Sequence, residues 1–428
     1  MFCPLPWIHL AIRNNGDLRV CCQANQGPDK GLLRKDNGTI YNAKDANFTE
    51  SRNCNKMKDI RKAFLNNEWH PDCLRCQREE ASNMNSRFSY EKKLWDHYIK
   101  EDDIKNKTNK DGSIDVNKFP LSYYDLRFGN KCNLKCRICG PTDSSNWYGD
   151  SLKLWGNTYD ESNTKMKIIK VGGKYQVENN IYEWYKGEHF WNYMENQIPN
   201  IQLVYMVGGE PLLIDEHFKF LETCIDKGYS DIKIEYNSNI SYIPNKAWDI
   251  WHNFKKVHIG VSMDGYGKVN EYIRYPSKWS VIEENLNKLN DAKGNFLIWL
   301  TCTVNVLNIF HLPEFFEWKI NQNFKNIGSE WQPIASLHPL HSPHFLNIKI
   351  FPIEVKQKIK EHFDRFIFNK YNDQAQQLLN HYLDFMFKED YSKSLPKFFY
   401  YNNKLDEIRN QKMQDYLPEL YELVKGYK

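Results

Sequence analysis

The stretch that decides the fold reads Leu126-Arg127-Phe128-Gly129-Asn130-Lys131-Cys132-Asn133-Leu134-Lys135-Cys136-Arg137-Ile138-Cys139-Gly140-Pro141. Its three cysteines are close enough in sequence to share one short loop. Thiolates are the usual protein ligands of iron–sulfur clusters, and a cubane cluster has four irons. Three thiolates can hold three irons and leave the fourth open to a ligand that arrives and leaves. The alternatives are a zinc knuckle and a chance grouping of cysteines.

A second pattern lies further along the chain. Residues 201–207 form an apolar, β-rich run that ends in Gly208, Gly209, Glu210 and Pro211, and a helical stretch follows from Ile214 to Lys227. Paired glycines let the backbone approach a ligand closely. Backbone carbonyls and a carboxylate at such a turn suit a cation. A plain glycine turn between strand and helix is the structural alternative.

Together these patterns resemble the radical S-adenosylmethionine enzymes, whose signature is C-x3-C-x2-C followed by a GGEP motif. One departure is visible: the residue before the third cysteine is usually aromatic, and here it is Ile138. The resemblance implies that Cys132, Cys136 and Cys139 hold a catalytic [4Fe-4S] cluster whose open iron is chelated by S-adenosylmethionine. It implies that one electron cleaves the cofactor and yields a 5′-deoxyadenosyl radical, which abstracts hydrogen from the substrate.

The resemblance also implies a cofactor-binding set at successive strand ends. Gly208, Gly209, Glu210 and Pro211 would receive the methionine ammonium. Ser262 and Asp264 would face the ribose, and Arg274 would pair with the carboxylate, because a guanidinium offers a bidentate fork to a planar anion. Asn237, at the polar tip of the third strand, and Asn305, at the end of the fifth, complete the set.

Strands alternate with helices over residues 119–340, and this order predicts a parallel β/α architecture with ligand-binding residues at the carboxyl ends of the strands. Six strands are expected, the fifth over 296–305 and the sixth near 329–335. We therefore predict an α/β fold with a partial (βα)6 barrel of TIM type, as in the resembled family. A small Cys-rich module containing a β-hairpin precedes it, and C-terminal helices follow.

The amino terminus carries a second cysteine set, Cys3, Cys21, Cys73 and Cys76. Residues 8–12 and 18–21 predict a hairpin whose turn contains Asn15 and Gly16, and this hairpin would place Cys3 and Cys21 on paired strands. The spacing Cys3–Gly16–Cys21 with a later CxxC resembles the auxiliary-cluster domains called SPASM and twitch. The resemblance implies a second [4Fe-4S] cluster with four thiolates and no open iron, although in the family the module usually follows the barrel.

Structural zinc is the alternative at this second site, because CxxC pairs serve zinc as well as iron–sulfur clusters. Cys22 could replace Cys21, but strand neighbours point to opposite faces, so only one of them can join the cage, and we choose Cys21. The other four of the 11 cysteines, Cys22, Cys54, Cys224 and Cys302, are expected to be small buried residues rather than reactive ones.

Composition bounds the remaining possibilities. A net charge of +4 on 428 residues does not by itself indicate a nucleic-acid partner. An aromatic content of 15% is assigned to core packing by default. No amino-terminal stretch resembles a signal peptide and no run is long enough to span a bilayer. Unpaired thiols suit a reducing compartment, so we expect a cytoplasmic protein that does not enter a membrane.

We expect four regions: an auxiliary module over 1–85, a helix and an exposed linker over 86–118, the barrel over 119–340 and a helical cap over 341–428. Gly172 and Gly173 are expected in a hairpin turn inside a polar insertion. His338, His341 and His344 are expected in a loop over the barrel mouth rather than on a metal, because the prolines between them deny a regular helix.

The predicted activity is oxidative modification of a peptide or protein by a radical enzyme, with an electron donor such as flavodoxin or ferredoxin. This substrate rests on family analogy. Radical dehydrogenation or epimerisation of a small molecule, such as an aminosugar or nucleotide, is an alternative. Epimerisation would need a hydrogen donor, for which Cys302 is the candidate. A non-enzymatic zinc-binding module is the last alternative.

Overall fold

The computed structural model describes residues 2–24, 29–81, 86–156, 158–161, 164–328 and 332–427. The chain forms two compact units, each made of several segments. Unit 1 comprises Met1–Lys131, Asn179–Tyr236 and Lys246–Val257, and unit 2 comprises Cys132–Glu178, Asn237–Asn245 and His258–Lys428. No described helix is both long enough and apolar enough to cross a membrane.

Unit 1 is built on parallel strands. β1 (His9–Ile12) pairs with β3 (Tyr123–Phe128), β3 with β7 (Leu203–Gly208) and β7 with β8 (Lys233–Ser238), all in parallel. β2 (Leu18–Arg19) pairs with β1 in antiparallel fashion. The predicted hairpin is confirmed, and Gly16 takes a φ of +87° in its turn. Its cysteines are not on paired strands as predicted, because Cys3 precedes α1 (Leu5–Ile8) and Cys21 follows β2.

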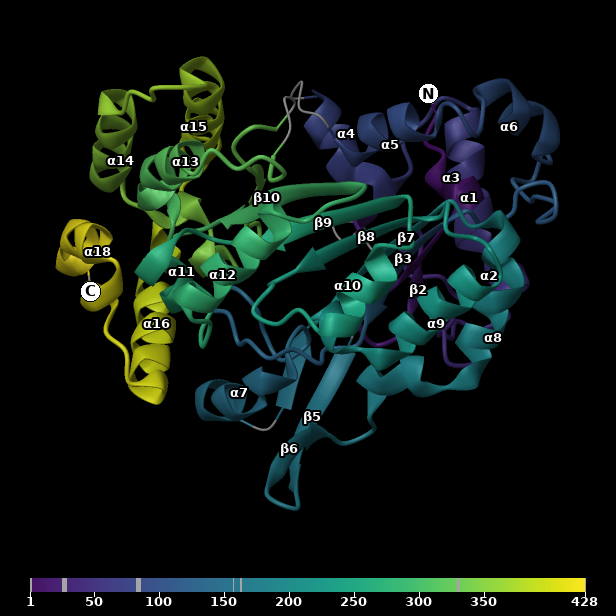
Figure 1. Cartoon of the computed structure of the whole chain (residues 1–428), viewed down its shortest axis with the longest axis horizontal. Helices are drawn as coiled ribbons and strands as arrows, with labels where there is room; N and C mark the ends of the chain where they lie inside the picture. The colour runs from purple at the N-terminus through teal and green to yellow at the C-terminus, as the bar shows by residue number, and fades with distance from the viewer. Residues whose placement is uncertain are drawn as a thin grey trace. The chain divides into compact units, whose positions relative to one another are not determined.

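Helices cover both faces of the parallel strands of unit 1 (Figure 1). On one face, Phe128 of β3 stacks on Trp191 of α8 (Glu188–Gln197) and on His217 of α9 (Asp215–Asp226), with ring centroids 5.7 and 5.8 Å apart. On the other face, Tyr123 of β3 stacks on Trp95 of α5 (Arg87–Trp95) at 5.7 Å. Such two-sided burial is typical of parallel sheets. The other α-helices of unit 1 are α2 (Phe48–Ser51), α3 (Asn55–Leu65), α4 (Leu74–Ala81), α6 (Glu101–Lys107) and α10 (Asn245–Trp251).

Unit 2 carries the later strands of the chain. β9 (Lys256–Ser262) enters it from unit 1 and is followed by β10 (Phe296–Val304) and β11 (Ser336–Pro339), and β10 and β11 run parallel. Between them lie α11 (Gly267–Ile273), α12 (Trp279–Asn290) and α13 (Leu312–Asn321). The predicted α/β class with mostly parallel strands is therefore confirmed, and β3, β7, β8, β9, β10 and β11 follow one another along the chain in the predicted order. Their closure into a partial barrel stays a prediction.

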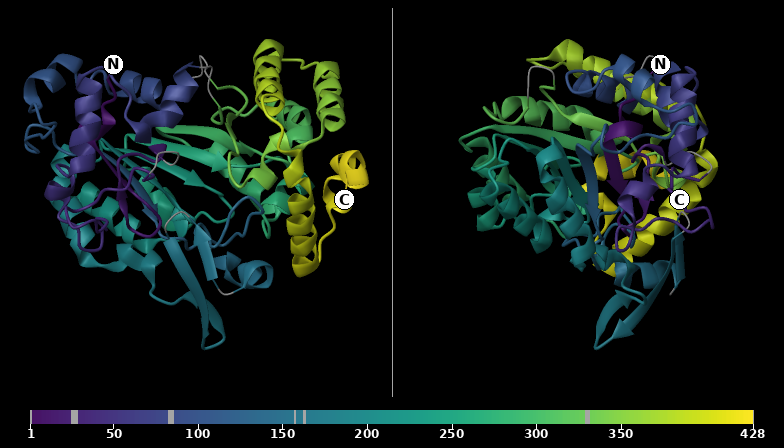
Figure 2. Two further views of the ribbon diagram at one scale, coloured as in Figure 1. Left: turned by 180° about the vertical axis from the view of Figure 1, so that it is seen from behind. Right: turned by 90° about the vertical axis from the view of Figure 1, so that its right-hand side faces the viewer.

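The insertion and the C-terminal region also belong to unit 2. α7 (Tyr148–Trp155) precedes a three-stranded sheet of β4 (Thr158–Glu161), β5 (Thr164–Val171) and β6 (Lys174–Val177). Gly172 and Gly173 form the predicted hairpin turn between the antiparallel strands β5 and β6 (Figure 2). The predicted C-terminal helices are present as α14 (Ile353–Arg365), α15 (Asn372–Phe387), α16 (Leu395–Arg409), α17 (Met413–Tyr416) and α18 (Pro418–Val424).

Two local predictions are wrong. The sixth strand begins at Ser336 instead of lying near 329–335, and it takes His338 out of the predicted loop; residues 329–331 lie outside the described part of the chain. Pro333 cannot donate to a strand ladder, which favours the later start. The stretch 100–118 is not simply an exposed linker, because it contains α6 and buries Ile104 and Ile114.

Candidate iron–sulfur sites

The three-cysteine loop of unit 2 has no helix or strand of its own, and its neighbours hold it in place. Lys135 donates its backbone N–H to the carbonyl of Tyr275 at 2.7 Å, and Arg137 donates to that of Ile273 at 2.6 Å. The indole of Trp147 donates to the carbonyl of Cys136 at 2.9 Å. These bonds fix the backbone on both sides of the central cysteine.

Arg137, between the second and third cysteines, is fully buried. Its guanidinium donates to the side chains of Asp406 at 2.5 Å, Asn402 at 2.9 Å and Gln411 at 3.0 Å. It also lies over the Tyr272 ring, 3.7 Å from the centroid. A buried charge is stable only where hydrogen-bond acceptors satisfy its N–H groups. Arg137 therefore fixes the loop to α16 and to the turn that follows this helix.

A second ion-pair group lies beside the first. The buried carboxylate of Asp150 accepts from Lys135 of the loop at 2.7 Å and from Arg409 of α16 at 2.9 Å. The Arg409 guanidinium lies over the Trp147 ring at 4.9 Å. Sequence reasoning missed Arg137, Asp150 and Arg409, because the Arg137–Asp406 and Arg409–Asp150 pairs join residues 269 and 259 positions apart.

Two of the loop cysteines interact directly. A hydrogen bond from Cys139 lowers the pKa of the Cys136 thiol, and the Arg274 guanidinium lowers it further. The same bond and burial raise the pKa of Cys139. Arg274 thus places a cation beside the two sulfurs, and its Nε lies 2.8 Å from a carboxylate oxygen of Asp264.

Asp264 is held from several sides. It is fully buried, and its other oxygen accepts the backbone N–H of Thr303 at 2.9 Å. Of the predicted cofactor residues, Asp264 and Arg274 therefore lie together next to the cysteines, and Ser262 is half-buried at the end of β9. The side chain of Asn305 is already used, donating to the Thr303 carbonyl at 2.7 Å and accepting from Leu307 at 2.9 Å. These two bonds use one of its two N–H donors and one of its two acceptor lone pairs.

The glycine turn lies at the end of β7 in unit 1. Gly208 has a φ of +123°, and a Cβ on Gly209 would lie 2.3 Å from the Lys131 carbonyl oxygen. Glu210 donates its backbone N–H to that oxygen at 2.8 Å, and its buried carboxylate accepts from Leu212 at 3.2 Å. Pro211 then begins a short 3₁₀ turn. The turn therefore needs glycine at position 209, as a close backbone approach predicts.

The tip of β8 holds two asparagines of unit 2. Asn237, the predicted one, lies against Gly260, where an added Cβ would be 2.3 Å from its side-chain oxygen. Asn239, which was not predicted as a site residue, donates toward the sulfur of Cys132 at 3.8 Å and to the side chain of Asn133 at 3.1 Å. Its sequence signal was only its place in the polar strand end.

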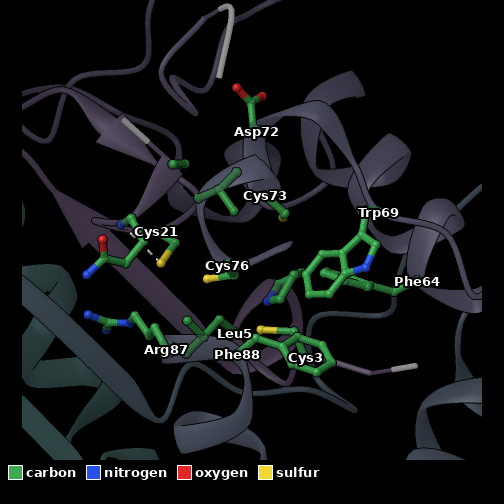
Figure 3. Close-up of a pocket in the computed structure, with 14 residues that line it drawn as sticks. Cys3, Leu5, Cys21, Phe64, Trp69, Asp72, Cys73, Cys76, Arg87 and Phe88 are labelled. Carbon is green, nitrogen blue, oxygen red and sulfur yellow. Dashed lines mark hydrogen bonds between the residues drawn. The ribbon is translucent and has the colours of Figure 1, made fainter. Parts of the chain in front are cut away.

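The amino-terminal cysteines come together in unit 1. Cys3, Cys21, Cys73 and Cys76 all line one cavity, whose other walls include Leu5, Val20, Phe64, Trp69 and Phe88 (Figure 3). They reach it from four places: before α1, after β2, the 3₁₀ turn Pro71–Cys73, and α4. Burial raises the pKa of Cys3 and raises that of Cys73 to about 12. These thiols become thiolates only with a cation or cluster to compensate them.

The chemistry of the donors fits an iron–sulfur cluster and also zinc, because both bind thiolates. Among the described residues, which include all eleven cysteines, no three His, Cys, Asp or Glu side chains converge as ligands of one metal ion.

The prediction that Cys22 is a small buried residue is wrong. It is half-buried, and the Arg87 guanidinium lies 2.7 Å from its sulfur. A hydrogen bond from Cys21 and the charge of Arg87 lower its pKa to about 6. Cys21 lines the cavity and Cys22 does not. Cys54, Cys224 and Cys302 are buried, as predicted. Cys22 instead combines partial exposure with a neighbouring cation, which are the conditions for a reactive thiol.

No protein-family model and no curated protein matches the chain. Solved structures do match it. Native anSMEcpe with bound AdoMet is 20% identical over 51% of this chain and 53% of that chain, with a TM-score of 0.34. Streptococcus suis SuiB bound to S-adenosylmethionine is 12% identical over 76% of this chain and 65% of that chain, with a TM-score of 0.33. SuiB bound to precursor peptide SuiA is 12% identical over 82% and 75%, with a TM-score of 0.33.

The chain thus spans about half the length of the anSMEcpe structure that it matches. Both of these proteins were solved with S-adenosylmethionine. The assignment of a function to this chain rests on its own residues.

Proposed function

We propose that the chain is a radical S-adenosylmethionine enzyme with a catalytic [4Fe-4S] cluster on Cys132, Cys136 and Cys139. The observation that carries the proposal is the three-cysteine loop itself, pinned at both flanks and accompanied by the Arg274–Asp264 pair. A loop that only stored a metal would gain nothing from three ligands instead of four. Three thiolates leave one coordination position for a chelating cofactor.

The bound cluster and S-adenosylmethionine would supply the radical that abstracts a substrate hydrogen. The contribution of the chain is to bind, orient and shield. Arg274 balances negative charge beside Cys136 and Cys139, and Asp264 keeps the guanidinium in place. Trp147 and the buried ion pairs of Arg137 and Asp150 keep the loop backbone from moving.

A second, fully ligated [4Fe-4S] cluster is proposed for Cys3, Cys21, Cys73 and Cys76. The four cysteines support this proposal because they line one cavity and thiolates are the usual ligands of iron–sulfur clusters; structural zinc is the alternative. A cluster with four thiolates has no open iron, so its use would be electron transfer. This supports net oxidation of the substrate, for which we propose a peptide or protein. A small-molecule substrate is the alternative, and its epimerisation would use Cys302, whose buried sulfur accepts from Asn308 at 3.5 Å, as hydrogen donor.

Anaerobic reconstitution tests the proposal. Iron, sulfide and zinc are quantified, and 5′-deoxyadenosine is measured after addition of S-adenosylmethionine and a strong reductant. About eight irons per chain, following from two cubanes, together with cofactor cleavage are the expected result. About four irons with cleavage would leave the radical enzyme and remove the second cluster. Zinc without iron and without cleavage would refute the enzyme.

A further inference from the structure

Asn239 has no role in the predicted site, yet its side chain is fixed next to a cysteine of the catalytic loop. Its oxygen accepts from the backbone N–H of Ser241 at 2.9 Å and from the Ser241 hydroxyl. Because a backbone N–H can only donate, the oxygen must face Ser241. The amide nitrogen therefore faces the other way, toward Asn133 and Cys132.

The contact closes a small polar ring. Asn239 donates to the oxygen of Asn133 at 3.1 Å, and Asn133 donates to the hydroxyl of Ser241 at 2.8 Å. One N–H of Asn239 is used in this ring, and the second points toward the Cys132 sulfur, 3.8 Å from the nitrogen. The same sulfur accepts the backbone N–H of Leu134 at 3.4 Å. Cys132 thus has one donor from its own loop and one from the tip of β8.

The turn that presents Asn239 is strained. Ile240 has a φ of +47°, a conformation that is an outlier for a β-branched residue. Such a conformation persists only where its surroundings hold it. Here Ser238 accepts the N–H of Ile240 at 3.0 Å, Asn285 donates to its carbonyl at 2.7 Å, and its side chain is fully buried. Strain of this kind clusters at functional sites.

We infer that Asn239 is a positioning residue that donates a hydrogen bond to the Cys132 thiolate and raises the reduction potential of the catalytic cluster. The inference rests on the proposed function. Hydrogen bonds to cluster sulfurs stabilise the reduced form, which carries more negative charge, and are among the determinants of cluster potential. The donor lies on a different chain segment from the cysteine loop, and the hydrogen bonds of Asn239 with Ser241 and Asn133 hold it beside the sulfur.

The test is the midpoint potential of the catalytic cluster, measured by electron paramagnetic resonance during reductive titration of the reconstituted full chain. Its signal is identified as the one that changes on addition of S-adenosylmethionine, since only a cluster with an open iron binds it. Asn239→Ala should lower the potential by about 59 mV, a tenfold change in a one-electron reduction equilibrium. Ile240→Gly, which relieves the strain and keeps the Asn239 side chain, should leave it unchanged.

An unchanged potential in Asn239→Ala would overturn the inference, and so would an equal fall in Ile240→Gly. If Asn239→Ala cannot hold the cluster, wild-type protein labelled with ¹⁵N-asparagine decides: a nitrogen coupling to the reduced cluster is expected, and its absence refutes the hydrogen bond. A wild type with no signal that responds to S-adenosylmethionine would instead refute the proposed function. The two failures are therefore distinguishable.

Discussion

Replacing Arg137 with methionine should release the catalytic loop while leaving the amino-terminal cysteines untouched. Methionine keeps an unbranched apolar side chain but removes the guanidinium, and with it the bonds to Asp406, Asn402 and Gln411. Breaking a buried charged pair by removing one partner costs about 3–5 kcal/mol. The structure argues for the lower end, about 3 kcal/mol, because Asp406 still accepts from the Tyr272 hydroxyl at 2.8 Å and from the Met413 N–H at 2.9 Å.

Two measurements check this prediction. Chemical denaturation of the metal-free chain should show the loss of stability, and iron analysis after reconstitution should fall from about eight to about four per chain, following the two-cubane count. Arg137→Lys should not rescue the loop, since one ammonium cannot reach all the acceptors of a planar guanidinium. Arg365, whose side chain is 79% exposed, provides the matched control; Arg365→Met should change neither quantity. Full iron and unchanged stability in Arg137→Met would refute the role of the anchor.

Three further predictions concern protons, backbone space and ligand choice. Burial lowers the pKa of His9 and of His217 to about 3. Between about pH 6.5 and pH 3 each histidine is therefore protonated in the unfolded chain but not in the folded one. The free energy of unfolding should fall across this range as the pH is lowered, by about 1.4 kcal/mol per pH unit for each histidine. Gly209→Ala should abolish cofactor cleavage without loss of iron, because its Cβ would meet the Lys131 carbonyl at 2.3 Å. Cys21→Ala should remove about four irons and Cys22→Ala none.

Each of these predictions has its own control. The free energy of unfolding is measured by urea denaturation at several pH values. His217→Gln should reduce its dependence on pH by about half, whereas replacement of the exposed His252 should not change it. Equal pH dependence in all variants would contradict the role given to His9 and His217. Gly187→Ala places a Cβ 3.7 Å from its nearest neighbour, so it should cleave S-adenosylmethionine normally. Iron loss in Cys22→Ala with retention in Cys21→Ala would reverse the ligand choice.

The sequence carried those parts of the fold that depend on local pattern. The alternation of β-rich runs with helical stretches predicted the parallel strands, and β7 and β10 lie where the pattern placed them. The hairpin at Gly16 and the turn at Gly172 followed from the demand for positive φ. The sixth strand was placed too early because its apolar run is short and interrupted by Pro333, so periodicity alone could not locate its start.

The candidate sites likewise contain residues that local spacing predicts and residues that it does not. Cysteine spacing is local, so the three-cysteine loop and the four amino-terminal cysteines could be named from sequence. What holds them is not local. Arg137 and its partner Asp406 are 269 residues apart, and Asn239 and Cys132 are 107 apart. No pattern within one segment marks such pairs, because only the folded backbone brings them together.

Cys22 shows why neighbouring residues of one type can differ in chemistry. Strand alternation predicted that Cys21 and Cys22 would not face the same way; both lie beyond β2, yet Cys21 lines the cavity and Cys22 does not, and the sequence did not indicate what the Cys22 sulfur contacts. The Arg87 guanidinium lies between that sulfur and the Tyr123 hydroxyl, at 2.7 and 2.8 Å, and Arg87 also lines the cavity of the four cysteines. One cation therefore compensates the negative charge of Cys22 and that of the cluster proposed for the cavity.

Replacing Arg87 with Gln should consequently raise the pKa of Cys22 and make the proposed auxiliary cluster harder to reduce, whereas Cys22→Ala should affect only the thiol titration. An unchanged auxiliary potential in Arg87→Gln would show that the cavity is screened from this charge.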